Sequence, residues 1–307
     1  MGAEVETLRL ARGWSALVVT RVDGFTLGAA SARGLPAVED WRHVLETLTD
    51  NPAATPGYAV LKYSEGGEVF RGRIAWGGGS LDVVGKRFTM RSFGRRLLAA
   101  GQPSKGRVDF DRGLDLLHAG IATALPLAIV ERGTPHREVW LITEFVPDAV
   151  DLAQVALVLL PRLESDRRRR VKNAITEAIV DLVDRMARHG FGHRDLKASN
   201  ILLTHWDSRD APVRPWLVDL EGLRPRRPWS AWRHRRPLVR LAASLLEHPA
   251  VTRTDYCRFL HGYLARAGVV REEWKPRYRV LADEAARYVR RAQRRKTGKL
   301  DGYGGDP

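Results

Sequence analysis

The sequence predicts an α+β protein of two lobes, in which a small antiparallel β lobe with one helix precedes a larger, mainly helical lobe. Two observations lead to this fold class. Short runs of β-forming residues separated by glycine turns fill residues 58–88, whereas after residue 151 apolar residues recur at helical spacings. The chain changes character near residues 147–151, so we expect one lobe at residues 1–147 and the other at residues 148–307.

The first lobe is predicted from its turn signals. Glycine turns near residues 65–67 and 77–79 separate β-rich runs, which predicts an antiparallel meander over residues 58–64, 69–76 and 81–88. A helix is expected over residues 104–118, ending at Gly120, before residues 139–145 return to strand.

The second lobe is predicted from helical periodicity. Val171, Ile175, Leu182 and Met186 share one face of a long helix that Gly190 ends and that Asp166 is expected to cap. Further helices are expected over residues 238–246, 255–267 and 280–295.

Composition limits the compartment and the partners. The chain has 51 Lys and Arg against 36 Asp and Glu, a formal charge of +15, which favours a polyanionic partner. A single cysteine and the lack of a secretory signal indicate a cytoplasmic protein. The apolar runs are shorter than the roughly 20 residues that span a bilayer, so we expect any membrane association to be peripheral.

A polar motif in the second lobe carries the chemistry of phosphoryl transfer. It reads His193-Arg194-Asp195-Leu196-Lys197-Ala198-Ser199-Asn200, and Asp219-Leu220-Glu221-Gly222 follows after a strand-like run. Phosphoryl transfer needs a carboxylate for the incoming hydroxyl, oxygen ligands for magnesium and cations for the phosphates. Asp195 and Lys197 are therefore the candidate catalytic residues. Asn200 and Asp219 are the candidate magnesium ligands.

These motifs resemble the catalytic and metal-binding loops of protein-kinase-like enzymes, and the resemblance implies an ATP site in the first lobe. Lys86 stands where such enzymes place a lysine for the nucleotide phosphates, with Asp109 as its expected helix partner in place of the usual glutamate. The other expected ATP contacts are a phosphate-covering loop and an adenine-contacting hinge, which comprise Ser64, Gly66, Gly67, Glu144 and Val146.

Residues 58–264 are similar to the lipopolysaccharide core kinase family, the Kdo/WaaP group. The similarity lies in residues 111–127, 139–145, 240–245 and 255–264 and in the Asp219-Leu220-Glu221 ending. It implies transfer from ATP, with Mg²⁺, to a sugar hydroxyl of Kdo or heptose in the inner core of a lipid A-linked glycolipid. Asp-Leu-Glu in place of Asp-Phe-Gly, and the lack of an Ala-Pro-Glu motif, argue against an ordinary protein kinase.

A basic segment with two tryptophans follows the metal-binding motif. Its guanidinium groups fit glycolipid phosphates and carboxylates, and its indoles fit a membrane interface. We therefore expect contact with an anionic glycolipid substrate or with the inner membrane through Arg224, Arg226, Arg227, Trp229, Trp232, Arg233, Arg235 and Arg236, in a run that continues to Arg240. The basic residues 287–299 suit a solvated helix or an anionic lipid surface equally.

Two alternative functions stay open. Another small-molecule or protein Ser/Thr kinase on the same fold would keep each catalytic residue and change only the acceptor. A nucleotide-binding pseudokinase would fit the altered glycine loop and the aspartate at position 109. A nucleic-acid partner is not expected, because the basic excess is not accompanied by a recognisable reading motif.

Overall fold

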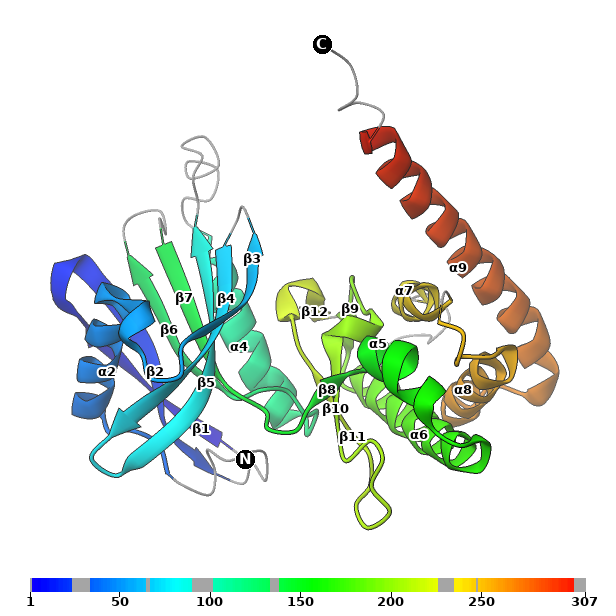
Figure 1. Ribbon diagram of the computed structural model, residues 1–307, viewed down its shortest axis with the longest axis horizontal. Helices are drawn as coiled ribbons and strands as arrows, with labels where there is room; N and C mark the ends of the chain where they lie inside the picture. Colours follow the sequence, from blue (N-terminus) through cyan, green and yellow to red (C-terminus); the bar gives the residue numbers. More distant parts are fainter. Residues whose placement is uncertain are drawn as a thin grey trace. The chain divides into compact units, whose positions relative to one another are not determined.

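The computed structural model describes residues 2–23, 34–64, 67–89, 102–132, 138–225, 235–246 and 248–300 (Figure 1). The chain divides into two compact units, residues 1–147 with 219–221 and residues 148–218 with 222–307. We call them the N-lobe and the C-lobe. Strands dominate the first and helices the second, which is the α+β organisation that the sequence predicts.

The N-lobe is built on an antiparallel sheet. Within the described residues it has seven strands in the order β1-β2-β6-β7-β5-β4-β3. Their bounds are β1 (Gly2–Arg9), β2 (Trp14–Asp23), β3 (Ala59–Ser64), β4 (Gly67–Trp76), β5 (Gly79–Thr89), β6 (Pro126–Arg132) and β7 (Glu138–Glu144). The predicted meander is confirmed as β3, β4 and β5, while the β1–β2 hairpin extends the sheet beyond the prediction.

Among the described residues of this lobe there are two α-helices, where the sequence predicted one. The expected helix is α4 (Lys105–His118), whose cap Ser104 accepts a hydrogen bond from the Arg107 backbone N–H at 3.0 Å. The additional helix is α2 (Val38–Asp50), which has no side-chain cap to announce it. Trp41 anchors α2, because its indole is buried and donates to the Val19 carbonyl at 3.0 Å.

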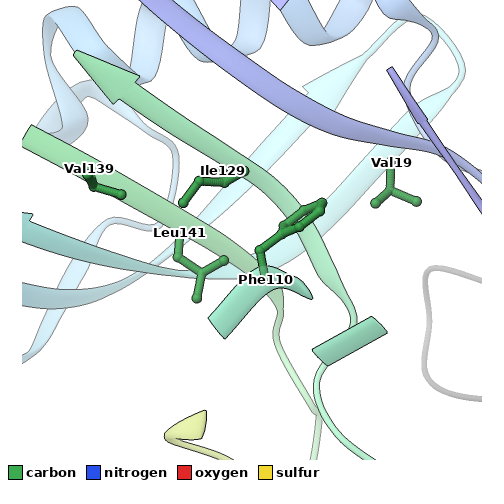
Figure 2. Close-up of a cluster of buried hydrophobic side chains, with 5 residues drawn as sticks. All are labelled: Val19, Phe110, Ile129, Val139 and Leu141. Carbon is green, nitrogen blue, oxygen red and sulfur yellow. The ribbon is translucent and has the colours of Figure 1, made fainter. Parts of the chain in front are cut away.

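A buried cluster joins α4 to the sheet (Figure 2). Phe110 of α4 packs with Val19, Ile129, Val139 and Leu141 from three strands. Large-to-small changes in such clusters typically cost 3–5 kcal/mol for phenylalanine. Because Asp109 precedes Phe110, this packing also fixes the turn of α4 that presents the carboxyl expected to meet Lys86.

The C-lobe consists of helices around short strands. The helices are α5 (Leu152–Gln154), α6 (Ser165–Arg188), α7 (Arg236–Leu245), α8 (Arg253–Arg266) and α9 (Arg271–Leu300). The strands are β8 (Val150–Asp151), β9 (Phe191–His193), β10 (Ile201–Thr204), β11 (Arg214–Leu217) and β12 (Leu223–Pro225). Helix α6 packs against α8, and α9 packs against α7 and α8 (Figure 1). Among the described residues, none of these helices is long and apolar enough to cross a membrane.

The helices of the C-lobe begin earlier than predicted, and α7 and α8 each begin two residues before the predicted starts at residues 238 and 255. Asp166 does not cap α6: the cap is Glu164, two residues earlier, and its carbonyl accepts the Arg168 N–H at 2.8 Å. Asp166 instead lies in the first turn, where a carboxylate favours the helix dipole. Helix α9 begins at Arg271, well before the predicted start at residue 280. A proline ordinarily argues against a helix interior, but Pro276 lies inside this helix.

A buried ion pair fixes the start of α8 and yields a stability prediction. Asp255 accepts from the Thr252 N–H at 2.8 Å and Oγ1 at 2.7 Å, and Lys172 Nζ lies 2.5 Å away. Burial alone would raise the pKa of Asp255, but the hydrogen bonds from Lys172 and Thr252 outweigh it and lower that pKa below its usual value. We expect Asp255→Ala to lower the free energy of unfolding at pH 7 by about 3 kcal/mol, since it strands the Lys172 charge.

Urea unfolding at several pH values checks this prediction. The folded-state pKa is depressed, so the carboxylate stabilises the fold above its unfolded pKa of about 3.9, and this stabilisation disappears as the pH falls further. The difference between wild type and variant should therefore shrink below about pH 4. Asp283→Ala, at an exposed position of α9, is the control and should change little. Equal losses in both variants would contradict the assignment.

Candidate active site

The loop of residues 193–200 carries the candidate catalytic residues, and we call it the catalytic loop. It begins at the end of β9, which pairs with β12 in the C-lobe. Two hydrogen bonds, one to the backbone and one to a ring, hold it. The Arg194 N–H donates to the Gly222 carbonyl at 2.8 Å, and the Asp195 N–H donates to His193 Nδ1 at 3.2 Å. His193 is fully buried. Both flanking residues thus hold the backbone that carries Asp195.

The structure brings three predicted residues together in this loop. Lys197 Nζ lies 3.2 Å from Asp195 Oδ2, and Asn200 Nδ2 donates to the Asp195 carbonyl at 3.0 Å. Because this bond uses the amide nitrogen of Asn200, its carbonyl oxygen is the atom that can bind a cation. Helix α7 supports the loop, since the Ala198 N–H donates to Ser244 Oγ at 2.9 Å.

A further contact to Asp195 was not predicted. Arg240 of α7 forms an ion pair with Asp195 Oδ1, and its guanidinium lies 4.5 Å from the ring centre of Tyr288 on α9. The sequence analysis placed Arg240 only in the basic run. Nothing in the local sequence connects it to Asp195, because the contact depends on how α7 packs.

Gly222 is required by a close approach within the C-lobe. A Cβ at this position would lie 2.7 Å from His193 Cε1 and 2.9 Å from its Nδ1. The buried ring has little room to yield. We therefore expect Gly222→Ala to destabilise the protein by about 1–3 kcal/mol, as overpacking usually does, and to lower turnover by disturbing the His193 bond to Asp195.

Thermal unfolding and turnover measured on the same preparation check this expectation. Gly262→Ala is a matched control: it lies in α8, and its Cβ would come no closer than 3.4 Å to Val180. That change should be neutral or stabilising, since alanine favours a helix over glycine. Normal turnover in Gly222→Ala would refute the role assigned to the glycine.

In the N-lobe, Lys86 of β5 is surrounded by three carboxylates. Its Nζ lies 3.0 Å from Asp219 Oδ1, 3.2 Å from Glu221 Oε1 and 3.8 Å from Asp109 Oδ2. Burial lowers the pKa of Lys86, but the three carboxylates outweigh it and hold that pKa above its usual value. Burial raises the pKa of Asp109 to about 7, against the lowering effect of Lys86. Lys86 therefore stays charged.

Glu221 is a site residue that the sequence analysis did not assign. Besides contacting Lys86, its carboxylate lies 3.4 Å from Lys105 Nζ of α4. Arg112, also on α4, donates to the carbonyls of Leu220 at 3.3 Å and Glu221 at 3.4 Å. The short Asp109 side chain is thus supplemented by a longer carboxylate from another segment. The sequence feature that could have identified Glu221 is its position two residues after Asp219, where it is a second acid in the same motif.

The backbone of Asp219 has a strained conformation. Its φ is 60°, in the left-handed region that aspartate enters more readily than most residues. Such conformations concentrate at functional sites.

Among the described residues, no group of three or more His, Cys, Asp and Glu side chains could hold a metal ion. A magnesium site needs fewer side chains, because substrate phosphates and water complete its coordination.

Three of the remaining expected ATP contacts, Gly67, Glu144 and Val146, lie among the described residues. Gly67 pairs closely with β5: a Cβ there would lie 1.9 Å from the Arg87 carbonyl oxygen, so the strand pairing itself requires glycine. Glu144 and Val146 are buried, and the Glu144 N–H donates to the Leu125 carbonyl at 2.9 Å. Gly66 and the side chain of Ser64 lie outside the described residues.

Only part of the basic segment is described. Arg235 donates to both carboxylate oxygens of Glu284, at 2.5–3.1 Å, and thereby joins the start of α7 to α9. Arg224 donates to the neighbouring Leu223 carbonyl at 3.2 Å, and Arg236 is exposed. The expected contacts that fall outside the described residues are Arg226, Arg227, Trp229, Trp232 and Arg233.

The C-lobe also contains an apolar cavity of about 370 Å³. Side chains from α6, α7, α8 and α9 line it, among them Ile175, Leu241, Leu260 and Leu281. Its volume is within the range of small-molecule sites. No sequence pattern indicated such a cavity.

A half-buried lysine among carboxylates and a loop that joins Asp195, Lys197 and Asn200 are the arrangement expected of a kinase of protein-kinase-like fold. Residues 110–263 match the lipopolysaccharide kinase (Kdo/WaaP) family. The lipopolysaccharide core heptose(I) kinase WaaP of Pseudomonas aeruginosa is 32% identical over 200 residues, covering 62% of this chain and 68% of that protein. The chain belongs to the lipopolysaccharide kinase (Kdo/WaaP) family.

The solved structures agree on the fold. The structure "WaaP in complex with acyl carrier protein" matches with a TM-score of 0.53 and 24% identity, covering 78% of this chain and 91% of that one. The predicted family and fold class are confirmed. The chain is a kinase that uses ATP, and its reaction is the phosphorylation of a lipopolysaccharide core sugar.

Proposed function

We propose that the acceptor is a heptose hydroxyl of the inner core, that Asp195 orients and deprotonates it, and that magnesium is required. The observation that carries this proposal is the catalytic loop, in which Asp195 is flanked by Lys197 at 3.2 Å and supported by Asn200 at 3.0 Å. The heptose is favoured over Kdo because the WaaP relative acts on heptose(I).

Each residue has one task in the transfer. The Asp195 carboxylate accepts the hydroxyl proton while the acceptor oxygen bonds to the γ-phosphorus and the bond to the ADP oxygen breaks. Lys197 neutralises charge on the transferring group, and Lys86 binds the nucleotide phosphates. Asn200 and Asp219 would each offer an oxygen ligand to magnesium, which would supply further positive charge to the phosphates.

The charge of the chain supports an anionic glycolipid at a membrane surface. The net charge is +15, and the exposed face of α9 carries Arg287, Arg290, Arg291 and Arg294. Each such residue near an anionic surface contributes about 1 kcal/mol. We therefore place the enzyme peripherally on the cytoplasmic face of the inner membrane, where its substrate would be accessible.

An acyl carrier protein is proposed as a partner. The WaaP structure was solved in complex with one, and the apolar cavity in this C-lobe suits a hydrocarbon chain. Calorimetry should show binding of the acylated carrier protein and at least tenfold weaker binding of the same carrier without its acyl chain, the difference expected for burying even two methylenes. Equal binding of the two forms would remove the cavity from this proposal.

Turnover of ATP tests the function. Purified full-length protein is assayed with magnesium, with and without a heptose-bearing lipid A glycolipid, and the product is examined by mass spectrometry. Acceptor-stimulated ADP formation with a phosphorylated heptose is the expected result. Turnover on a neutral sugar or a protein instead would favour another kinase function. Nucleotide binding without turnover on any acceptor would favour the pseudokinase.

A further inference from the structure

Arg240 has no task in the transfer described above, yet it contacts the residue on which the transfer depends. It lies on α7, and its guanidinium pairs with Asp195 Oδ1. The other carboxylate oxygen, Oδ2, lies 3.2 Å from Lys197 Nζ. Each oxygen of the catalytic carboxylate therefore faces a cation. Since Lys197 is expected to turn to the transferring phosphoryl group, Arg240 is the cation that competes with the acceptor hydroxyl.

The surroundings of Arg240 allow it to change partner. Its side chain is 28% exposed, so solvent and substrate can reach it. Stacking on Tyr288 holds the plane of the guanidinium and leaves its N–H edge available for a carboxylate or phosphate. Burial also lowers the pKa of Arg240, which shows incomplete solvation of its charge.

Arg235, the residue just before α7, behaves differently. Both oxygens of Glu284 engage its guanidinium, which commits it to the contact between α7 and α9. Arg240 instead pairs with the one carboxylate that must be available during catalysis. An arginine in that position can leave the carboxylate when an acceptor binds, provided that the acceptor carries a negative charge to which the guanidinium can pair.

We propose that Arg240 selects acceptors that carry a phosphate or carboxylate beside the target hydroxyl. That anionic group draws the guanidinium away from Asp195, and the freed carboxylate then receives the hydroxyl. Water and neutral sugars offer no such group, so they meet a carboxylate still paired with Arg240. This inference rests on the proposed glycolipid kinase function and identifies the residue that gives it acceptor specificity.

ATP hydrolysis without acceptor gives the first test, because it does not depend on the glycolipid. In Arg240→Gln, Asp195 Oδ1 loses its cation while Lys197 still faces Oδ2. The freed oxygen can orient water, so hydrolysis should rise roughly tenfold, the lower range expected for losing one charge-assisted contact. Arg266→Gln is the matched control. Arg266 lies on α8, is also 28% exposed, and pairs with the carboxylates of Glu177 and Asp181 on α6. Its hydrolysis should stay at the wild-type rate. Unchanged or lower hydrolysis in Arg240→Gln would overturn the proposal.

Acceptor preference gives the second test. The wild type should prefer the phosphorylated, Kdo-bearing glycolipid over a neutral heptoside, and Arg240→Gln should reduce that preference roughly tenfold to a hundredfold, mainly through a higher KM for the anionic acceptor. An equal loss of kcat on both acceptors would show that Arg240 only positions Asp195. If the wild type phosphorylates neither acceptor, the proposed function fails, and the hydrolysis comparison still decides the role of Arg240.

Discussion

Replacing Asp195 with asparagine should reduce turnover by roughly 10² to 10⁴ while the fold is retained, because a positioned acid or base contributes about that much. Asparagine has the same shape, and the backbone bonds from Asn200 and to His193 remain possible. The variant lacks the carboxylate that we expect to accept the hydroxyl proton. Steady-state ADP release and circular dichroism on the same sample measure both quantities.

The control for this variant should remove a comparable ion pair elsewhere in the C-lobe. Asp207 pairs with Arg167 and is not part of the catalytic loop. Asp207→Asn should keep wild-type turnover, since exposed pairs contribute about 0–1 kcal/mol to stability. Near-normal turnover in Asp195→Asn would refute the assigned mechanism, including the interpretation of the Arg240 contact as a competitor for the hydroxyl.

Lys86→Met should have the second largest effect, and it should act on both activity and stability. We expect turnover at low ATP to fall roughly tenfold to a hundredfold, as a charged contact to the nucleotide phosphates is lost. The free energy of unfolding should fall by about 1–3 kcal/mol, because the 3% exposed Asp109 loses its cation. The KM for ATP and urea unfolding measure the two effects.

A double variant separates the two effects of Lys86→Met. Adding Asp109→Leu removes the buried carboxyl that needs a cation, so stability should recover while turnover stays low. Lys105→Met serves as the control, because Lys105 also contacts Glu221 but is 69% exposed. It should be close to wild type in both measurements. Recovery of turnover in the double variant would mean that Lys86 only neutralises Asp109.

Local sequence patterns were sufficient for most elements and for the residues that share a short segment. The β3–β5 meander, α4 and the loop from Asp195 to Asn200 are each specified by neighbouring residues, so periodicity and motif spacing predicted them. Even so, the start of α6 was misplaced at Asp166, since an acid favours the first turn as well as the cap.

Long-range contacts could not be predicted in the same way. The pairing of Arg240 with Asp195, and of Glu221 with Lys86, depends on tertiary packing that no local pattern records. Helix α2 was missed for a different reason: its start has no capping side chain, and its burial depends on Trp41 reaching the Val19 carbonyl. In each case the deciding partner is distant in sequence.

The attachment of α4 to residues 219–221 has a consequence for regulation. Many protein kinases are switched off by moving the helix that pairs with the strand lysine. Here Arg112 fastens that helix to the segment that carries Asp219, so an outward swing would break these contacts together with the Lys86 pair. We therefore expect an enzyme that is constitutively assembled, whose output in the cell follows the supply of acceptor rather than a signal.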